Sequence, residues 1–431
     1  MTRVELSVGL ADLGQPGVEW CHWGFRKEQA EPQGMKTVQR AHIKGEILRW
    51  ARETMNLEIS EAAKKIGVKP DRLEDCENEE ALLTLRQLRN AAIAYKRPLA
   101  AFFLPEPPRD FHVPHDFRRL PGEPERTLSP ELVTAIREAQ YRRALAMELA
   151  EEVEQKPSSF VGSLSTEADV EQSAIKVRKL LDVSLDQQKS WDKPYDPLNN
   201  WKDAIEKAGA LVFHFAQVDV EEIRAFSISD VPFPVISVNG GDSPNGRVFS
   251  LLHEFGHLLL GHGGTCDFRE TEEGNSSDQD AEVFCNYLAG AVLVPASDLV
   301  TQPSVREAGK ATTWDDPELQ GLAKLYGVSR QVILRRLLIT GKTSRTFYRT
   351  KQQELVELGR EAAEKKGGFL PPPRKVVRNV GQAFLRIVLG AYYRESITSS
   401  DLAEYIGARL KHLPTIEGLL AGRNILTGSD N

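Results

Sequence analysis

The segment RVFSLLHEFGHLLLGH, residues 247–262, decides how the rest of the chain is interpreted. It has the apolar content of a buried helix, yet it contains two histidines and a glutamate among its leucines. His253 and His257 are four residues apart, so their side chains share one face of a helix. Burying ionisable groups costs several kcal/mol unless something compensates them. The segment therefore predicts a metal ion held by the two imidazoles.

Zinc is the metal that this spacing favours. Two imidazoles at positions i and i+4 can bind one zinc ion. Glu254 directly follows the first histidine, where it can accept a proton from an attacking water molecule. The sequence thus predicts Zn²⁺ as the cofactor and Glu254 as a catalytic general base.

A catalytic zinc also needs a third protein ligand. In the next predicted helix, DAEVFCNYLAGAVLVP at residues 280–295, Glu282 directly precedes an apolar run. Glu282 is therefore the first candidate ligand, with Asp278 and Asp280 as alternatives. A carboxylate at the start of a helix also favours the helix dipole, and this second interpretation of Glu282 stays open at this point.

Several other polar side chains near these positions need an interpretation. Asn286 lies one turn beyond Glu282, where it could hydrogen-bond a ligating histidine. His262 falls off the ligand face and fits a residue at a helix end. His214, in the strand-like run LVFHF, is expected to be a hydrogen-bonded strand histidine, and Cys285 a small buried side chain. A residue that stabilises an oxyanion is also expected. The candidates for that role are Tyr287, His262, His214 and Arg247.

Length and composition limit the class of protein. A chain of 431 residues predicts two to four domains, and its net charge of −7 gives no global attraction for nucleic acid. The four cysteines are scattered without CxxC spacing, which favours a reducing compartment. No apolar run reaches about 18 residues, and the first residues do not resemble a secretory signal. We therefore expect a cytoplasmic protein with no membrane association.

The pattern of helices and strands predicts an α+β chain that is mostly helical. Residues 1–36 form an N-terminal extension, and residues 37–105 a set of short helices. Residues 106–159 combine a Pro-rich linker with a polar helix. Residues 160–345 contain the two metal-ligand segments and a small β-sheet of two or three strands. Residues 346–431 form a helical or mixed C-terminal domain.

The second of these units has the pattern of a helix-turn-helix. In EISEAAKKIGVKPDRLEDCENEE, residues 58–80, two helical runs flank a turn at Gly67. The second run, residues 69–80, has two basic and six acidic residues, so its charge is 2 − 6 = −4. DNA binding relies on Lys and Arg to neutralise phosphates, so a protein-recognition role competes with DNA binding here. The better DNA candidate is residues 324–386, with fifteen basic residues and four Glu, although a solvated helical face explains it as well.

Together, these segments resemble the ImmA/IrrE family of metallopeptidases. The resemblance rests on IRAFSI (223–228), PFPVISVNG (232–240), the helix 247–262 and EVFCNYLAGAVLVP (282–295). Family members have a strand that ends in Asn, then an Arg, then Phe–Thr before the zinc helix, and a Glu with a small residue and Asn after the loop. The corresponding residues here are Asn239, Arg247, Phe249, Ser250, Glu282, Cys285 and Asn286, with Ser in place of the usual Thr.

The resemblance implies a zincin-like peptidase domain at residues 160–345, with His253, His257 and Glu282 as zinc ligands and Glu254 as general base. It also implies an N-terminal Xre-type helix-turn-helix domain. The implied function is a zinc endopeptidase that cleaves a helix-turn-helix repressor and so derepresses stress, mobile-element or defence genes. The alternatives are a transcription regulator whose peptidase-like domain only binds a partner, and a defence component that acts by protein contact.

Overall fold

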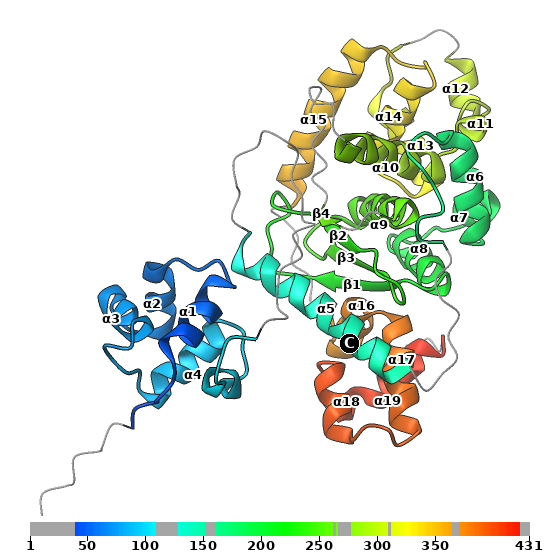
Figure 1. The fold of residues 1–431 in the computed structure, drawn as a ribbon. Coiled ribbons are helices and arrows are strands. Elements are labelled where there is room, and N and C mark those ends of the chain that lie inside the picture. The colour runs from blue at the N-terminus through cyan, green and yellow to red at the C-terminus, as the bar shows by residue number, and fades with distance from the viewer. Residues whose placement is uncertain are drawn as a thin grey trace, which may run out of the picture.

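A computed structural model describes residues 39–108, 128–150, 160–261, 264–265, 277–308, 312–363 and 370–422 (Figure 1). The chain is mostly helical with one small sheet, which confirms the predicted α+β class. The N-terminal extension 1–36 and most of the linker 106–127 lie outside the described residues. Among the helices that the structure describes, none has the length and apolar content needed to cross a bilayer.

A compact unit of short helices follows the start of the described chain. It consists of α1 (Gly45–Glu53), α2 (Ile59–Ile66), α3 (Pro70–Glu77), α4 (Leu85–Ala94) and the 3₁₀ helix η1 (Leu99–Phe103). Helix α2 ends at Gly67, whose φ of 83° is left-handed, and this turn leads directly into α3. Apolar residues of all five helices form one core. The unit thus has a helix, a tight turn and a helix where the sequence predicts them.

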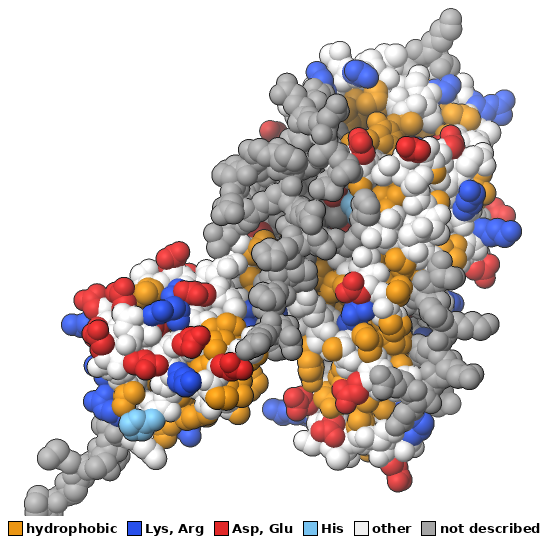
Figure 2. Space-filling model, in the orientation of Figure 1, with side chains coloured by type: hydrophobic (Ala, Val, Ile, Leu, Met, Phe, Trp, Pro, Cys, Tyr) orange, Lys and Arg blue, Asp and Glu red, His pale blue; other side chains and the backbone are white. Residues whose placement is uncertain are grey.

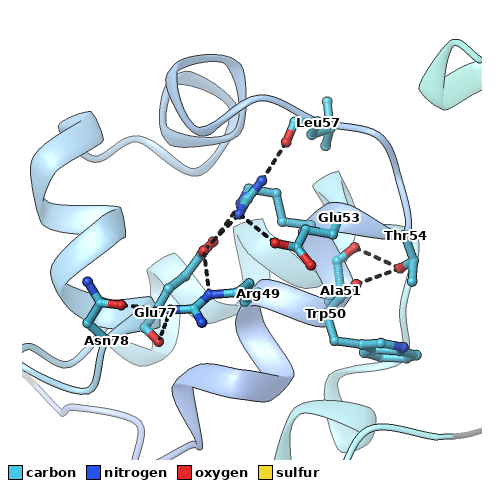
Figure 3. Close-up of polar contacts among 9 residues, drawn as sticks. Arg49, Trp50, Ala51, Glu53, Thr54, Leu57, Glu77 and Asn78 are labelled. Atoms are coloured by element: carbon cyan, nitrogen blue, oxygen red, sulfur yellow. Dashed lines mark hydrogen bonds and ion pairs between the residues drawn. The ribbon is translucent and has the colours of Figure 1, made fainter. Parts of the chain in front are cut away.

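A buried ion pair fixes α3 against α1 in this unit (Figure 3). Glu77, at the end of α3, accepts hydrogen bonds from Arg52 at 2.7 and 2.9 Å. Arg49 donates to the carbonyl of Glu77 and to the side chain of Asn78. The backbones approach so closely that a Cβ at Gly45 would lie 2.3 Å from the Glu77 carbonyl oxygen. One of the six acidic charges counted in residues 69–80 is therefore used inside the protein.

The sheet has four strands in the order β1-β3-β2-β4. Its strands are β1 (Leu211–Phe215), β2 (Ala225–Ile228), β3 (Val235–Asn239) and β4 (Gly264–Thr265). Strands β1 and β3 are parallel, with Leu211 opposite Val235, and β2 pairs antiparallel with both β3 and β4. Every residue of β1 and β3 is buried, so helices cover both faces of the sheet. The sequence predicted two or three strands, and the short strand β4 is an addition.

One face of the sheet supports the metal-ligand helices. Val212, Ile236 and Val238 of the sheet pack into a core with Phe255 and its neighbours. The helices of this part of the chain are α6 (Val170–Leu180), α7 (Leu185–Lys189), α8 (Asp196–Lys207), α9 (Pro244–Leu260), α10 (Ser277–Leu293), α11 (Ala296–Leu299), α12 (Pro303–Glu307), α13 (Asp316–Tyr326), α14 (Arg330–Ile339) and α15 (Arg345–Ala363). Leu355 of α15 also enters this core, and α15 packs against α14.

The other face of the sheet carries a second core, below β1 in Figure 1. Phe213, Phe226 and Val235 point into it from the sheet. Its helices are α5 (Pro130–Ala150), α16 (Pro372–Val380), α17 (Gln382–Tyr393), α18 (Ser399–Tyr405) and α19 (Leu413–Leu420), with the 3₁₀ helix η2 (Leu410–His412) before the last of them. The sheet is therefore a layer between two sets of helices.

Candidate metal centre

Helix α9 has sequence signals at both ends that set its position. The Ser243 side chain accepts a hydrogen bond from the Gly246 N–H, and Pro244 occupies the first turn. Gly261 ends the helix with a φ of 72°. Between these ends, the apolar residues of α9 pack against the sheet and α8. The helix therefore holds its two histidines on a rigid, buried support.

Helix α10 is fixed at its C-terminal end by three side chains from other helices. The carbonyls of residues 292–294 accept hydrogen bonds from Arg178 of α6 at 2.7 Å, Gln188 of α7 at 2.9 Å and Arg336 of α14 at 2.7 Å. Carbonyls at a helix end have no partner within the helix, so these bonds satisfy groups that burial would otherwise penalise. Glu171 in turn pairs with Arg336.

Helices α9 and α10 lie in close contact at the level of the histidines. A Cβ at Gly256 would lie 3.0 Å from the Sγ atom of Cys285, so the absence of a side chain at Gly256 permits this approach. The contact brings the start of α10 next to His253 and His257.

The structure brings His253, His257 and Glu282 together. The two histidine Nε2 atoms are 3.1 Å apart. The Oε2 atom of Glu282 lies 3.2 Å from Nε2 of His253, and its Oε1 atom lies 3.4 Å from Nε2 of His257. Both histidines are buried, whereas the Glu282 side chain is 19% exposed. Within the described chain, these are the three side chains whose ligand atoms gather closely enough to hold a metal ion.

The spacing of these atoms fits a zinc ion. Zinc binds nitrogen and oxygen ligands at about 2.0–2.1 Å in a tetrahedral arrangement, which separates neighbouring ligand atoms by roughly 3.3 Å. The three observed separations of 3.1, 3.2 and 3.4 Å surround that value. Two imidazole nitrogens and one carboxylate are also a donor set that zinc favours in catalytic sites. The residues present therefore fit the predicted metal.

The charges of the site favour a neutral histidine and an ionised carboxylate. Burial lowers the pKa of His253, and the neighbouring Glu282 opposes that effect only in part. Burial alone would raise the pKa of Glu282, but its hydrogen bonds to His253 and His257 bring it well below the usual range. Metal ligation requires an unprotonated imidazole nitrogen and a carboxylate, so both residues are in the form that a metal needs.

Two further side chains support the histidines. Asn286 is buried, and its side chain is close enough to His253 to raise the pKa of the imidazole. The Cys285 side chain lies against His257 and is completely buried, and this burial raises the pKa of its thiol. Asn286 thus lies near His253, and its role as a hydrogen-bond partner of a ligating histidine stays a prediction.

The other candidate residues are distributed differently. Glu254 is completely buried on α9, and Asp280 is exposed at the start of α10. His262 and the side chain of Asp278 lie outside the described residues. Tyr287 is half-buried on α10, with the Arg335 guanidinium 5.3 Å from its ring centre. Neither His214, on the strand farthest from β4, nor Arg247, in the first turn of α9, belongs to the group of three possible ligands.

Sequence reasoning missed the side chains that hold α10. Arg178 and Gln188 lie more than 100 residues from the carbonyls they bind, and Arg336 lies 42 residues away. No local spacing signals such contacts, because they depend on how the helices are arranged around the sheet.

Residues 205–338 match the Peptidase_M78 family, described as an IrrE N-terminal-like domain. This segment is similar to the IrrE peptidase domain. The match includes α9, α10 and all three residues of the candidate metal centre. It supports the resemblance to the ImmA/IrrE family and a metallopeptidase-type domain, and it does not extend to the N-terminal helices. A comparison with curated proteins finds no match to the chain.

Proposed function

We propose that the protein is a zinc-dependent endopeptidase. The observation that carries this proposal is the meeting of His253, His257 and Glu282 at tetrahedral ligand spacing. The three residues come from two different helices and lie inside the segment that is similar to a peptidase domain. The positions of Arg178, Gln188 and Arg336 provide a rigid support for the helix that contributes Glu282.

The side chains at the site supply the elements of peptide hydrolysis. A bound zinc ion acts as a Lewis acid, which polarises a carbonyl group and makes water more acidic. Glu254 follows His253 on α9 and, in this proposal, accepts a proton from the attacking water and transfers it to the leaving amine. In this proposal, Asn286 orients the imidazole of His253, whose pKa it raises.

The proposed substrate is a helix-turn-helix repressor, whose cleavage would derepress stress, mobile-element or defence genes. This part rests on the family resemblance, which implies an Xre-type domain, and on the order of a helix, the Gly67 turn and a second helix in α2 and α3. The proposed compartment is the cytoplasm, where such a repressor acts.

The N-terminal unit is better suited to a protein partner than to DNA. Asp71 and Glu74 are exposed on α3, and Figure 2 shows acidic side chains spread over this unit. Within the basic stretch 324–386, Arg336 is buried against Glu171, and Lys351 pairs with Asp316 at 2.8 Å. Internal pairing of this kind reduces the positive charge that this stretch can offer to DNA.

The decisive test uses the purified protein and a small helix-turn-helix repressor encoded beside its gene. We expect the zinc-loaded protein to cut the repressor, a chelator to stop cleavage, and added zinc to restore it. The matched variant Glu254→Gln should keep one zinc per chain and lose cleavage. Cleavage by this variant at the wild-type rate would contradict the mechanism. Stable binding of the repressor by the zinc-loaded wild type, without cleavage, would favour the non-catalytic regulator instead.

A further inference from the structure

A second group of polar side chains, three of them buried and Arg378 half-buried, lies where α8, β1, the first turn of α9 and the end of α16 meet. Its members are Lys202, His214, Arg247 and Arg378. The Lys202 Nζ atom donates a hydrogen bond of 2.9 Å to the Arg378 carbonyl. Burial lowers the pKa of His214, and the positive charges of the other three residues lower it further. Three basic side chains thus lie close enough to His214 to disfavour its protonation.

His214 differs from the hydrogen-bonded strand histidine that the sequence predicted. Its side chain projects from β1 and the residue is only 4% exposed. The ring lies beside the Arg378 carbonyl. Even so, neither ring nitrogen makes a hydrogen bond of normal geometry to any residue that the structure describes. A buried imidazole without such bonds costs free energy unless another molecule supplies them.

Arg247 also has buried polar atoms that lack hydrogen-bond partners, and its guanidinium carries a charge as well. It is 4% exposed, and its guanidinium interacts with the hydroxyl of Tyr195. Its Nε and Nη1 atoms have no hydrogen-bond partner in the described part of the chain. The carboxylate of Asp242 is nearby, but it pairs with Arg224 at 3.2 Å. The charge of Arg378 adds repulsion.

The two acidic groups near this junction, Glu206 and Asp203, face Gln382, although the Oε1 atom of Glu206 has no hydrogen-bond partner in the described part of the chain. Glu206 of α8 accepts a hydrogen bond of 3.2 Å from the Gln382 N–H, and Asp203 accepts one of 2.7 Å from the Gln382 side chain. Both acidic side chains lie close to Lys202, and they oppose the lowering of its pKa by burial. Arg247 and Arg378 make no ion pair with either of them among the described residues. The positive charges of Arg247 and Arg378 at this junction therefore remain unpaired with these two acidic side chains.

We propose that this junction binds a small oxyanion of the size of inorganic phosphate, between Arg247, Arg378 and His214. An oxyanion accepts hydrogen bonds from several donors at once and also neutralises the guanidinium charges. A water molecule could satisfy individual donors but would leave the charge uncompensated. The bound anion would join α9, which carries the two histidines, to α16 of the C-terminal helices. It would lie about 9 Å along α9 from His253, at 1.5 Å for each of the six residues between positions 247 and 253.

The proposal is tested by binding inorganic phosphate to the full chain. Isothermal titration and thermal unfolding are measured with phosphate, and in parallel with sulfate, against chloride at equal ionic strength. We expect saturable binding of one anion per chain and a rise in Tm that chloride does not produce. Anion binding is measured without repressor, so its outcome does not depend on peptidase activity.

Three variants distinguish this site from a general salt effect. Arg247→Met and Arg378→Met should each weaken phosphate binding at least tenfold, and Arg306→Met, on the exposed surface of α12, should leave it unchanged. Should Arg247→Met fail to fold, the half-buried Arg378 decides the question. Absence of saturable binding, equal binding by all variants, or a crystal structure grown in phosphate that shows only water at the junction would overturn the proposal.

Discussion

At the scale of single residues, the candidate metal centre depends on one carboxylate that lies 25 residues beyond the second histidine. We expect Glu282→Ala to abolish stoichiometric zinc binding, because two histidines alone leave the ion without its third protein ligand. Metal analysis of the purified variant checks this. Asp280→Ala is the matched control, since Asp280 is exposed on the same helix and should keep one zinc per chain. Unchanged zinc content in Glu282→Ala would place the third ligand elsewhere.

Asn286 permits a finer test at the same scale. In the proposed site, Asn286 orients His253 and is not itself a ligand of the ion. Partners of this kind typically contribute about 10–100-fold to metal affinity. We therefore expect Asn286→Ala to bind zinc about 10–100-fold more weakly while it remains folded. Competition with a fluorescent chelator measures the affinity, and an affinity equal to that of the wild type would show that Asn286 has only a packing role.

At the scale of helices, the rigidity of α10 depends on the side chains that bind its last carbonyls. Arg336→Met keeps most of the buried stem but removes the bond to the Val294 carbonyl and the pairing with Glu171. We expect it to lower the free energy of unfolding by about 1–3 kcal/mol, because a buried carbonyl loses its partner. Urea unfolding measures the change. The exposed Arg306 offers the control Arg306→Met, which should change stability by less than about 0.5 kcal/mol.

The packing of α8 against α17 predicts a dependence on pH. Burial raises the pKa of Glu206 from 4.5 to about 7, despite the opposing charge of Lys202. The folded protein thus binds this proton more tightly than the unfolded chain does. The contribution of Glu206 to stability is largest below about pH 4.5 and falls as pH rises to about 7. Glutamine does not titrate, so Glu206→Gln should not lose stability in this way. Its free energy of unfolding relative to the wild type should therefore increase between pH 5 and 8, by on the order of 3 kcal/mol at most. The free energy of unfolding of both proteins is measured by urea unfolding across this pH range. A difference between them that stays constant from pH 5 to pH 8 would contradict the prediction.

The same scale shows what the sequence could and could not predict. The spacing of His253 and His257, and Glu282 before an apolar run, identified residues that the structure brings together, because helical periodicity relates sequence to position directly. Strand β4 has only two residues, and its pairing with Phe226 depends on the sheet rather than on local pattern. The hydrogen bonds that hold α10, and the failure of His214 to find a normal partner, are likewise products of tertiary packing.

At the scale of the whole molecule, helix α5 joins the N-terminal unit to the sheet. Val133 packs in the N-terminal core, whereas Leu132 and Ile136 pack in the second core, with Phe213 of the sheet. Arg137 donates a hydrogen bond to the Thr54 carbonyl, and Asn56 donates one of 3.2 Å to the Leu128 carbonyl. The N-terminal unit is therefore joined to the rest of the described chain through the packing of α5 and through these polar contacts.

The charge distribution makes a prediction about DNA. Because α3 presents Asp71 and Glu74 to solvent and part of the basic stretch 324–386 is paired internally, we expect no saturable binding of duplex DNA at moderate salt. Fluorescence anisotropy with short duplex and single-stranded DNA, at low and moderate salt, measures this. Tight binding that weakens steeply with salt would show that one of these regions contacts nucleic acid after all.

The two-sided sheet has a practical consequence for dissecting the protein. Phe213, Phe226 and Val235 are buried in a core that they share with α5, α16 and α17, and these three helices lie outside residues 205–338. A fragment cut to that segment would carry every candidate zinc ligand and still expose a row of aromatic and aliphatic side chains to water. It should aggregate on expression, and the smallest piece worth making begins before residue 128 and continues through residue 422.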